Sequence, residues 1–241
     1  MDDAERVPAG DDWLAPAERA RLAALRVERR RAAWRLGRWT AKRAVALADG
    51  RCGLALDRIA IIATESGAPL ALIDAAPAPC AISISHAAGR ALCVVAPPAA
   101  AVGCDLERVE PRSAAFVADY FTAAERAAVD RAAPHERAVL ATLIWSAKEA
   151  VLKAMREGLR LDTRAAEVTP ASGVSVQGWR PLSAVHPFSG RRFDGWWRRE
   201  GDCVATVAAD AALEPPRALD LRALALSDGR LPGSVRDQRE L

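Results

Sequence analysis

The chain has 241 residues, 51% of them hydrophobic, and its 34 basic and 31 acidic residues leave a formal net charge of +3. This length allows one large domain or two modest ones, and the near balance of charge argues against an obligate nucleic-acid or membrane partner. The longest apolar stretches, 75–89 and 91–104, are interrupted by prolines and are too short to span a bilayer.

The cysteines and the N-terminus predict a cytoplasmic protein with reduced thiols. The five cysteines form no C-x-x-C pair, and their odd number argues against both a disulfide scaffold and a zinc site. The first residues are acidic where a secretory signal would be basic.

The first part of the chain is expected to be one long helix followed by strands. Residues 1–15 are interpreted as a loose leader, and a helical pattern rich in Ala, Leu and Arg runs from Pro16 to about Asp49. Short β-like runs follow at 58–63, 81–85 and 91–96, with Gly and Pro turns between them. A Pro/Ala connector covers 96–101.

The second part repeats this mixture of helices and strands. We expect a strand at 102–106, helices at 113–120, 122–131 and 134–157 (the last ending at Gly158), and strands at 167–168, 173–177, 192–198 and 203–208. The fold class is therefore α+β, with two similar halves at 16–98 and 102–210 and a loosely ordered tail at 211–241.

Two carboxylates stand close together in Val102-Gly103-Cys104-Asp105-Leu106-Glu107. On a strand, Asp105 and Glu107 project from the same face. Mg²⁺ would suit such a pair, because it prefers carboxylate oxygens and keeps positions open for water or phosphate. A polar strand end facing water would give the same pattern.

A second candidate segment is Trp145-Ser146-Ala147-Lys148-Glu149, which continues to Lys153. Trp145, Glu149 and Lys153 are spaced by four residues and share one helix face. They could form an exposed Glu–Lys pair, but the Trp on the same stripe favours burial, and a buried acid and base serve a ligand or each other.

Two further features could bind anions. Ser85 and His86 end a β-run before a Gly-containing turn, although a lone His is more often structural. Within the basic stretch 26–43, a helical stripe is formed by Arg31, Arg35, Arg38 and Lys42. Guanidinium groups bind phosphates bidentately, yet such a stripe is usually a solvated face, and no nucleic-acid motif accompanies it.

Together these segments resemble the 4′-phosphopantetheinyl transferase family. Its G-x-D-x-E motif is matched at 103–107, its W-[ST]-x-K-E-[SA]-x-x-K motif at 145–153, its F-[ST]-x-x-E segment at 121–125 and its S-x-S-H segment at 83–86. The length is similar to that of the monomeric, two-half surfactin-synthetase-activating type.

The resemblance implies transfer of 4′-phosphopantetheine from coenzyme A to a serine of an apo acyl or peptidyl carrier protein, with release of 3′,5′-ADP. It implies that Asp105, Glu107 and Glu149 ligate Mg²⁺ (or Mn²⁺), and that Glu149 or Glu107 acts as base. It also implies the phosphate-facing and coenzyme-A-binding residues, which are Lys148, Lys153, Ser85, His86, Arg31 and Arg38.

The implied fold is an internal pseudo-dimer of two α+β halves with the site in the cleft between them. The family often has Gly-Lys-Pro where this chain has Gly67-Ala68-Pro69, so one phosphate-binding lysine is absent. The alternative is a non-catalytic anion-binding or carrier-docking protein of the same fold. The carrier could belong to polyketide, nonribosomal peptide or fatty-acid synthesis.

Overall fold

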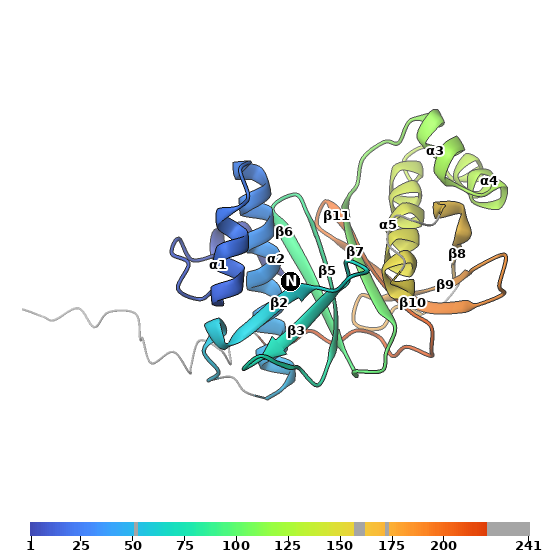
Figure 1. Ribbon diagram of the computed structural model, residues 1–241. Coiled ribbons are helices and arrows are strands. Elements are labelled where there is room, and N and C mark those ends of the chain that lie inside the picture. The colour runs from blue at the N-terminus through green and yellow to red at the C-terminus, as the bar shows by residue number, and fades with distance from the viewer. Residues whose placement is uncertain (51–52, 157–161, 172–173, 221–241) are drawn as a thin grey trace, which may run out of the picture.

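The structure, a computed structural model, describes residues 1–50, 53–156, 162–171 and 174–220 and has the expected α+β architecture. Five α-helices and three antiparallel sheets make up this part of the chain. Figure 1 shows α1 and α2 on one side of the molecule and α3 to α5 on the other, with β2, β3, β5, β6 and β7 between them. None of the described helices is long and apolar enough to cross a membrane.

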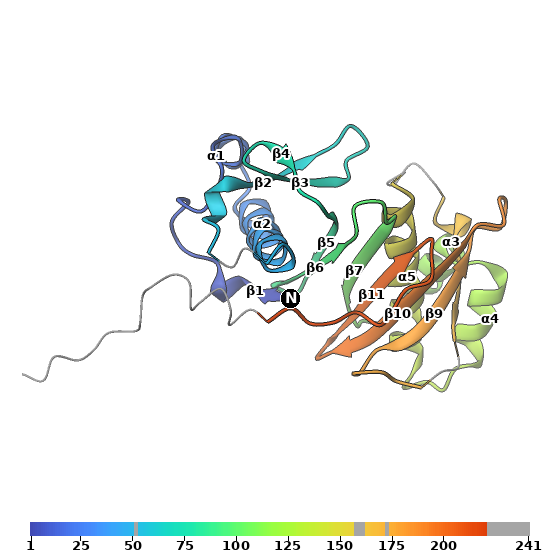
Figure 2. The ribbon, with the colours of Figure 1, turned by 90° about the horizontal axis from the view of Figure 1, so that it is seen from below.

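In the N-terminal half, two small sheets pack against α2. Its elements are β1 Asp2–Asp3, α1 Pro16–Ala23, α2 Glu28–Ala48, β2 Ile59–Ala63, β3 Pro69–Ile73, β4 Ala76–Pro77, β5 Ala81–Ala87 and β6 Arg90–Ala96. The sheets have the orders β1-β6-β5 and β2-β3-β4. Ala41 and Val45 of α2 pack on isoleucines of both sheets, because small residues on one helix face allow a close approach. Figure 2 shows α2 lying against β5 and β6.

The single helix expected over 16–49 is two helices. α1 ends at Ala23 and α2 begins at Glu28, with a turn between them. The side chain of Arg31 donates to the carbonyl oxygens of Leu22 (2.7 Å) and Leu25 (3.3 Å) and so caps the end of α1. A sequence rich in Ala, Leu and Arg gives no local signal for this break, because these residues favour helix throughout.

The prediction that residues 1–15 form a loose leader is wrong. Asp2 pairs with Ala91 at the edge of β6 and is only 2% exposed. Trp13 and Leu14 are buried in a cluster with Leu22 of α1. Burial of Trp13 and Leu14 therefore holds this segment against the fold. In the sequence, the many charged residues around this pair hide its contribution.

The C-terminal half is one five-stranded antiparallel sheet, of order β7-β11-β10-β9-β8, with α5 packed on one face. Its elements are β7 Val102–Arg108, α3 Ala114–Tyr120, α4 Ala123–Arg131, α5 Arg137–Met155, β8 Glu167–Pro170, β9 Arg180–Val185, β10 Arg192–Glu200 and β11 Cys203–Ala209. Val151 and Ala154 of α5 meet Phe193 and Val204 in its core.

Most remaining predictions for this half are confirmed within a few residues, but three need comment. β9 was not anticipated, and of the strand expected at 173–177 the described residues form only a bridge from Val176 to Trp179. The predicted helix end at Gly158 lies outside the described residues.

The tail prediction is tested only in part, because 221–241 are also outside the described residues. Residues 211–220 form no helix or strand, as expected. They are nevertheless held to the fold, since the indole of Trp196 donates to the carbonyl oxygen of Leu213 at 2.6 Å.

The helices α2 and α5 carry the same four-residue pattern at corresponding places. Trp39-Thr40-Ala41-Lys42 of α2 matches Trp145-Ser146-Ala147-Lys148 of α5. Both lysines are fully buried and each forms an ion pair with a buried glutamate, Glu18 or Glu125. A single four-residue match does not produce a visible period in the sequence, so this repeat is apparent only from the structure.

Candidate active site

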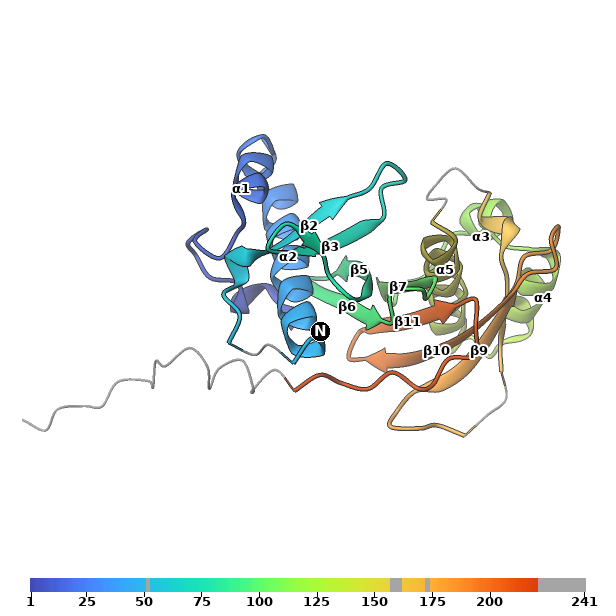
Figure 3. The same ribbon diagram turned by 60° about the horizontal axis from the view of Figure 1, so that its bottom comes forward.

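Strands β5 and β7 lie side by side at the centre of the molecule, and α5 crosses β7 (Figure 3). Asp105 on β7 is 4% exposed, and its Oδ1 accepts hydrogen bonds from Ser85 Oγ (2.8 Å) and Lys153 Nζ (2.7 Å). Its Oδ2 is buried and has no hydrogen-bond partner. Asp105, Lys153 and Ser85, which were predicted from three separate segments of the sequence, are thus in contact.

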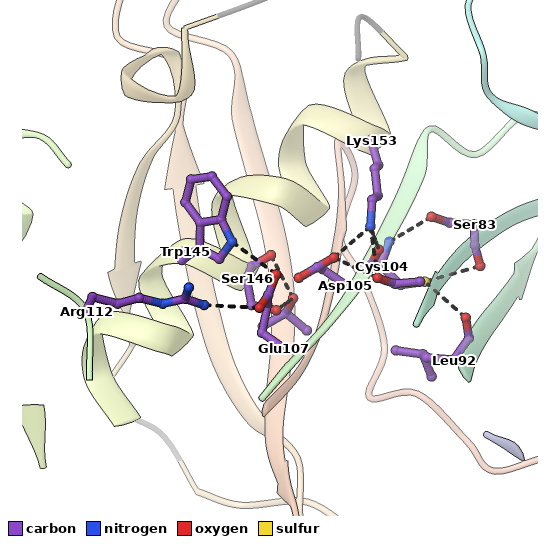
Figure 4. Close-up of polar contacts among 11 residues, drawn as sticks. Ser83, Leu92, Cys104, Asp105, Glu107, Arg112, Trp145, Ser146 and Lys153 are labelled. Carbon is purple, nitrogen blue, oxygen red and sulfur yellow. Dashed lines mark hydrogen bonds and ion pairs between the residues drawn. The ribbon is translucent and has the colours of Figure 1, made fainter. Parts of the chain in front are cut away.

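Glu107 lies two residues further along β7, and Trp145 and Arg112 donate hydrogen bonds to its carboxylate (Figure 4). Its Oε1 accepts from Trp145 Nε1 and its Oε2 from Arg112 Nη2, both at 3.1 Å. Burial raises the pKa of Glu107 and the charge of Asp105 adds to this rise, while Trp145 and Arg112 oppose it.

Glu149 is half-buried on α5, and its Oε1 has no hydrogen-bond partner. Burial raises the pKa of this carboxyl, the charges of Asp105 and Glu107 raise it further, and Lys153 acts in the opposite direction. Each of the three carboxylates therefore lies within electrostatic reach of the others.

Lys153, one turn further along α5, directs its ammonium into this cluster. Nζ donates to Ser85 Oγ and to the carbonyl oxygen of Cys104, both at 3.1 Å, and to Asp105. Burial disfavours the charged lysine, but Asp105, Cys104 and Glu149 together outweigh burial and raise the pKa of Lys153, which therefore carries a positive charge at neutral pH.

The chemistry of this cluster fits a divalent cation. Asp105 and Glu149 each have a buried carboxylate oxygen without a hydrogen-bond partner. Burial and the neighbouring negative charges raise the pKa of Glu107 and of Glu149. A hard cation would compensate these costs, and carboxylate oxygens are its preferred ligands. In the described part of the chain, however, no three His, Cys, Asp or Glu side chains form a ready-made ligand set.

A cavity of about 440 Å³ opens between α2 and the ends of β2, β3 and β5, on the face of β5 opposite to Ser85. The guanidinium of Arg38 lies 4.7 Å from the ring centre of Trp34, and its Nε is buried without a hydrogen-bond partner. Burial lowers the pKa of Arg38. His86 is exposed and lines the same cavity, next to Ser85 but on the opposite face of β5.

The predicted arginine stripe is divided by the structure. Arg38 lines the cavity, whereas Arg31 caps α1, pairs with Glu28 at 3.5 Å and does not line it. Arg30, which is not part of the predicted stripe, does line the cavity. Its spacing of four residues from Trp34 and eight from Arg38 is the helical signal that could have found it.

Lys148 does not join the other site residues. It is fully buried, pairs with Glu125 Oε2 at 2.8 Å and donates to the carbonyl oxygens of Thr163 and Ala166. These three contacts use all three donors of the ammonium group, so none is left for a phosphate. The position expected for Lys148 is wrong, because the spacing of residues on a helix does not show which neighbouring element each face meets.

Comparison with known proteins bears on one part of the chain. The search of curated proteins found no match to the chain. Residues 101–198, which include β7, α5 and the three carboxylates, are similar to the family model of the 4′-phosphopantetheinyl transferase superfamily.

Proposed function

We propose that this protein transfers 4′-phosphopantetheine from coenzyme A to a serine of an apo carrier protein, with Mg²⁺ or Mn²⁺ and release of 3′,5′-ADP. The observation that carries the proposal is the pair of buried, unpartnered oxygens of Asp105 and Glu149 beside the charged Lys153, within the segment matched by the superfamily model. Such a cluster suits a reaction that cleaves the P–O bond of a pyrophosphate.

Each residue has a role that its contacts support. Asp105, Glu107 and Glu149 would hold the cation, which neutralises charge on the pyrophosphate when bound. Glu149 or Glu107 would accept the proton of the carrier serine through a water molecule. Lys153 is held in its charged form by Asp105, Cys104 and Glu149 together and would stabilise or protonate the departing phosphate of 3′,5′-ADP.

The cavity beside β5 would hold the adenosine 3′,5′-bisphosphate end of coenzyme A. Arg38 and His86 line it, and the unpartnered Nε of Arg38 is a donor that an anionic ligand could satisfy. Ser85 would connect the two regions, since its backbone borders His86 while its hydroxyl contacts Asp105 and Lys153.

We expect Arg38→Ala to weaken coenzyme A binding by about tenfold or more, because a half-buried charged donor to phosphate is lost. Isothermal titration calorimetry with coenzyme A measures the effect. Arg29→Ala is the matched control, since Arg29 is an exposed residue of the same helix and does not line the cavity. Equal affinities of the two variants would contradict the assignment of the cavity.

We also propose that the two halves are an internal pseudo-dimer within a monomeric chain. The repeated Trp-[Ser/Thr]-Ala-Lys pattern on α2 and α5 and their two buried Lys–Glu pairs support it. The short helices α1 and α4, which carry those glutamates, support the same relation.

Intact-mass spectrometry of carrier proteins tests the proposed activity. Incubation of the protein with coenzyme A, Mg²⁺ and a panel of apo acyl and peptidyl carriers should add the mass of one phosphopantetheine group to at least one carrier. The same mixture with EDTA should leave every carrier unmodified. Tight coenzyme A binding without modification of any carrier would instead favour a non-catalytic binding protein of the same fold.

A further inference from the structure

We infer that Lys148 is a positioning residue of the proposed reaction: its buried ion pair with Glu125 fixes α5 so that Glu149 faces β7. The inference rests on the proposed function for the role of Glu149. It assigns to Lys148 a part different from the phosphate contact that the motif suggested.

The Lys148–Glu125 pair joins three elements. Glu125 Oε2 accepts from the backbone N–H of Thr122, and Oε1 from that of Val168, both at 2.8 Å. Lys148 thereby ties α5 to the start of α4 and to β8. Loss of one partner would leave the other charge buried and unpaired, which is strongly unfavourable.

The N-terminal half contains the same construction. Lys42 pairs with Glu18 and donates to the carbonyl oxygens of Trp13 (2.9 Å) and Leu56 (3.0 Å). Glu18 in turn accepts from the backbone N–H of Ala15 (3.0 Å) at the start of α1 and of Ile61 (2.9 Å) on β2. Every type of contact around Lys148 thus has a counterpart around Lys42.

The residues that follow the two lysines differ in chemistry. Glu149 follows Lys148 and Lys153 lies one turn later, whereas the corresponding positions in α2 are Arg43 and Leu47. Arg43 forms an ion pair with Asp2 at 2.6 Å. The half without a carboxylate cluster on its helix keeps the buried lysine, so this lysine serves the scaffold in both halves and the chemistry belongs to Glu149 and Lys153.

The matched variants Lys148→Met and Lys42→Met test the inference. We expect both to lower the melting temperature by similar amounts and to keep the Kd for coenzyme A within about threefold of the wild-type value. Carrier loading should lose kcat in Lys148→Met, without a matching rise in the KM for coenzyme A, because Glu149 is displaced. It should change little in Lys42→Met.

Rescue separates the ion pair from a direct ligand contact. Lys148→Met combined with Glu125→Gln removes the unpaired buried charge, and we expect it to recover a large part of the lost melting temperature and kcat. This double variant is also the fallback if Lys148→Met alone does not fold.

Weakening of coenzyme A binding by tenfold or more in Lys148→Met or the double variant, but not in Lys42→Met, would overturn the inference, since it would indicate a phosphate contact. If the wild-type chain binds no coenzyme A, the proposed function fails. Equal thermal losses with rescue would then still support the scaffold role of the pair.

Discussion

Glu149→Gln is expected to abolish Mg²⁺-dependent loading of an apo carrier while the protein stays folded. Gln has the shape of Glu but carries no charge, so it would remove one cation ligand and one candidate base. We expect kcat to fall by about 10³-fold or more. The melting temperature should stay the same or rise slightly, because burial and two neighbouring carboxylates already disfavour the charge of Glu149.

A matched control and a binding measurement make this test specific. Glu136→Gln changes an exposed glutamate at the start of the same helix and should leave loading unchanged. Wild-type protein should gain melting temperature with Mn²⁺, whereas Glu149→Gln should gain less. Full activity of Glu149→Gln would remove this residue from the proposed mechanism, whatever its effect on stability.

Strand and helix periodicity predicted from sequence which residues share a face, whereas only the family resemblance implied that the carboxylates and Lys153 form one site. Asp105 and Glu107 follow the two-residue repeat of β7, and Glu149 and Lys153 the four-residue spacing of α5. The contact between Ser85 and Asp105 requires β5 and β7 to lie side by side, a long-range arrangement that neither period encodes.

The errors share one physical cause, which is that tertiary contacts override local patterns. Lys148 has the charge and spacing of a phosphate ligand, yet Glu125 and two backbone carbonyl oxygens use its three donors. Arg31 has the same charge, but its Nη1 donates to carbonyl oxygens at the end of α1. The same holds for residues 1–15, where burial of Leu14 outweighs a polar composition. A buried charge with protein partners and one with a ligand look alike in sequence.

Gly103→Ala is expected to destabilise the protein by about 3 kcal/mol or more. A Cβ at position 103 would lie 1.9 Å from the carbonyl oxygen of Ala150 and 2.6 Å from the backbone nitrogen of Ala154. Both are backbone atoms of α5, so neither a rotamer change nor a small side-chain shift relieves the clash. Urea unfolding followed by circular dichroism measures the loss.

Gly37→Ala is the control for this change, because its Cβ would meet only the side chain of Ile84 at 3.6 Å. We expect that variant to gain about 0.5–1 kcal/mol, as alanine favours the interior of a helix. Similar stabilities of the two variants would show that β7 does not pack directly on the backbone of α5.

The close approach at Gly103 also explains why glycine belongs to the G-x-D-x-E segment. Asp105 lies two residues further along β7, and Glu149 lies beside Ala150 on α5, so the same crossing that excludes a side chain at position 103 brings the carboxylates together. If Gly103→Ala folds with the strand moved outward, it should bind Mn²⁺ more weakly than wild type. A variant that loses stability but keeps its Mn²⁺ affinity would separate the packing of α5 on β7 from the proposed cation site.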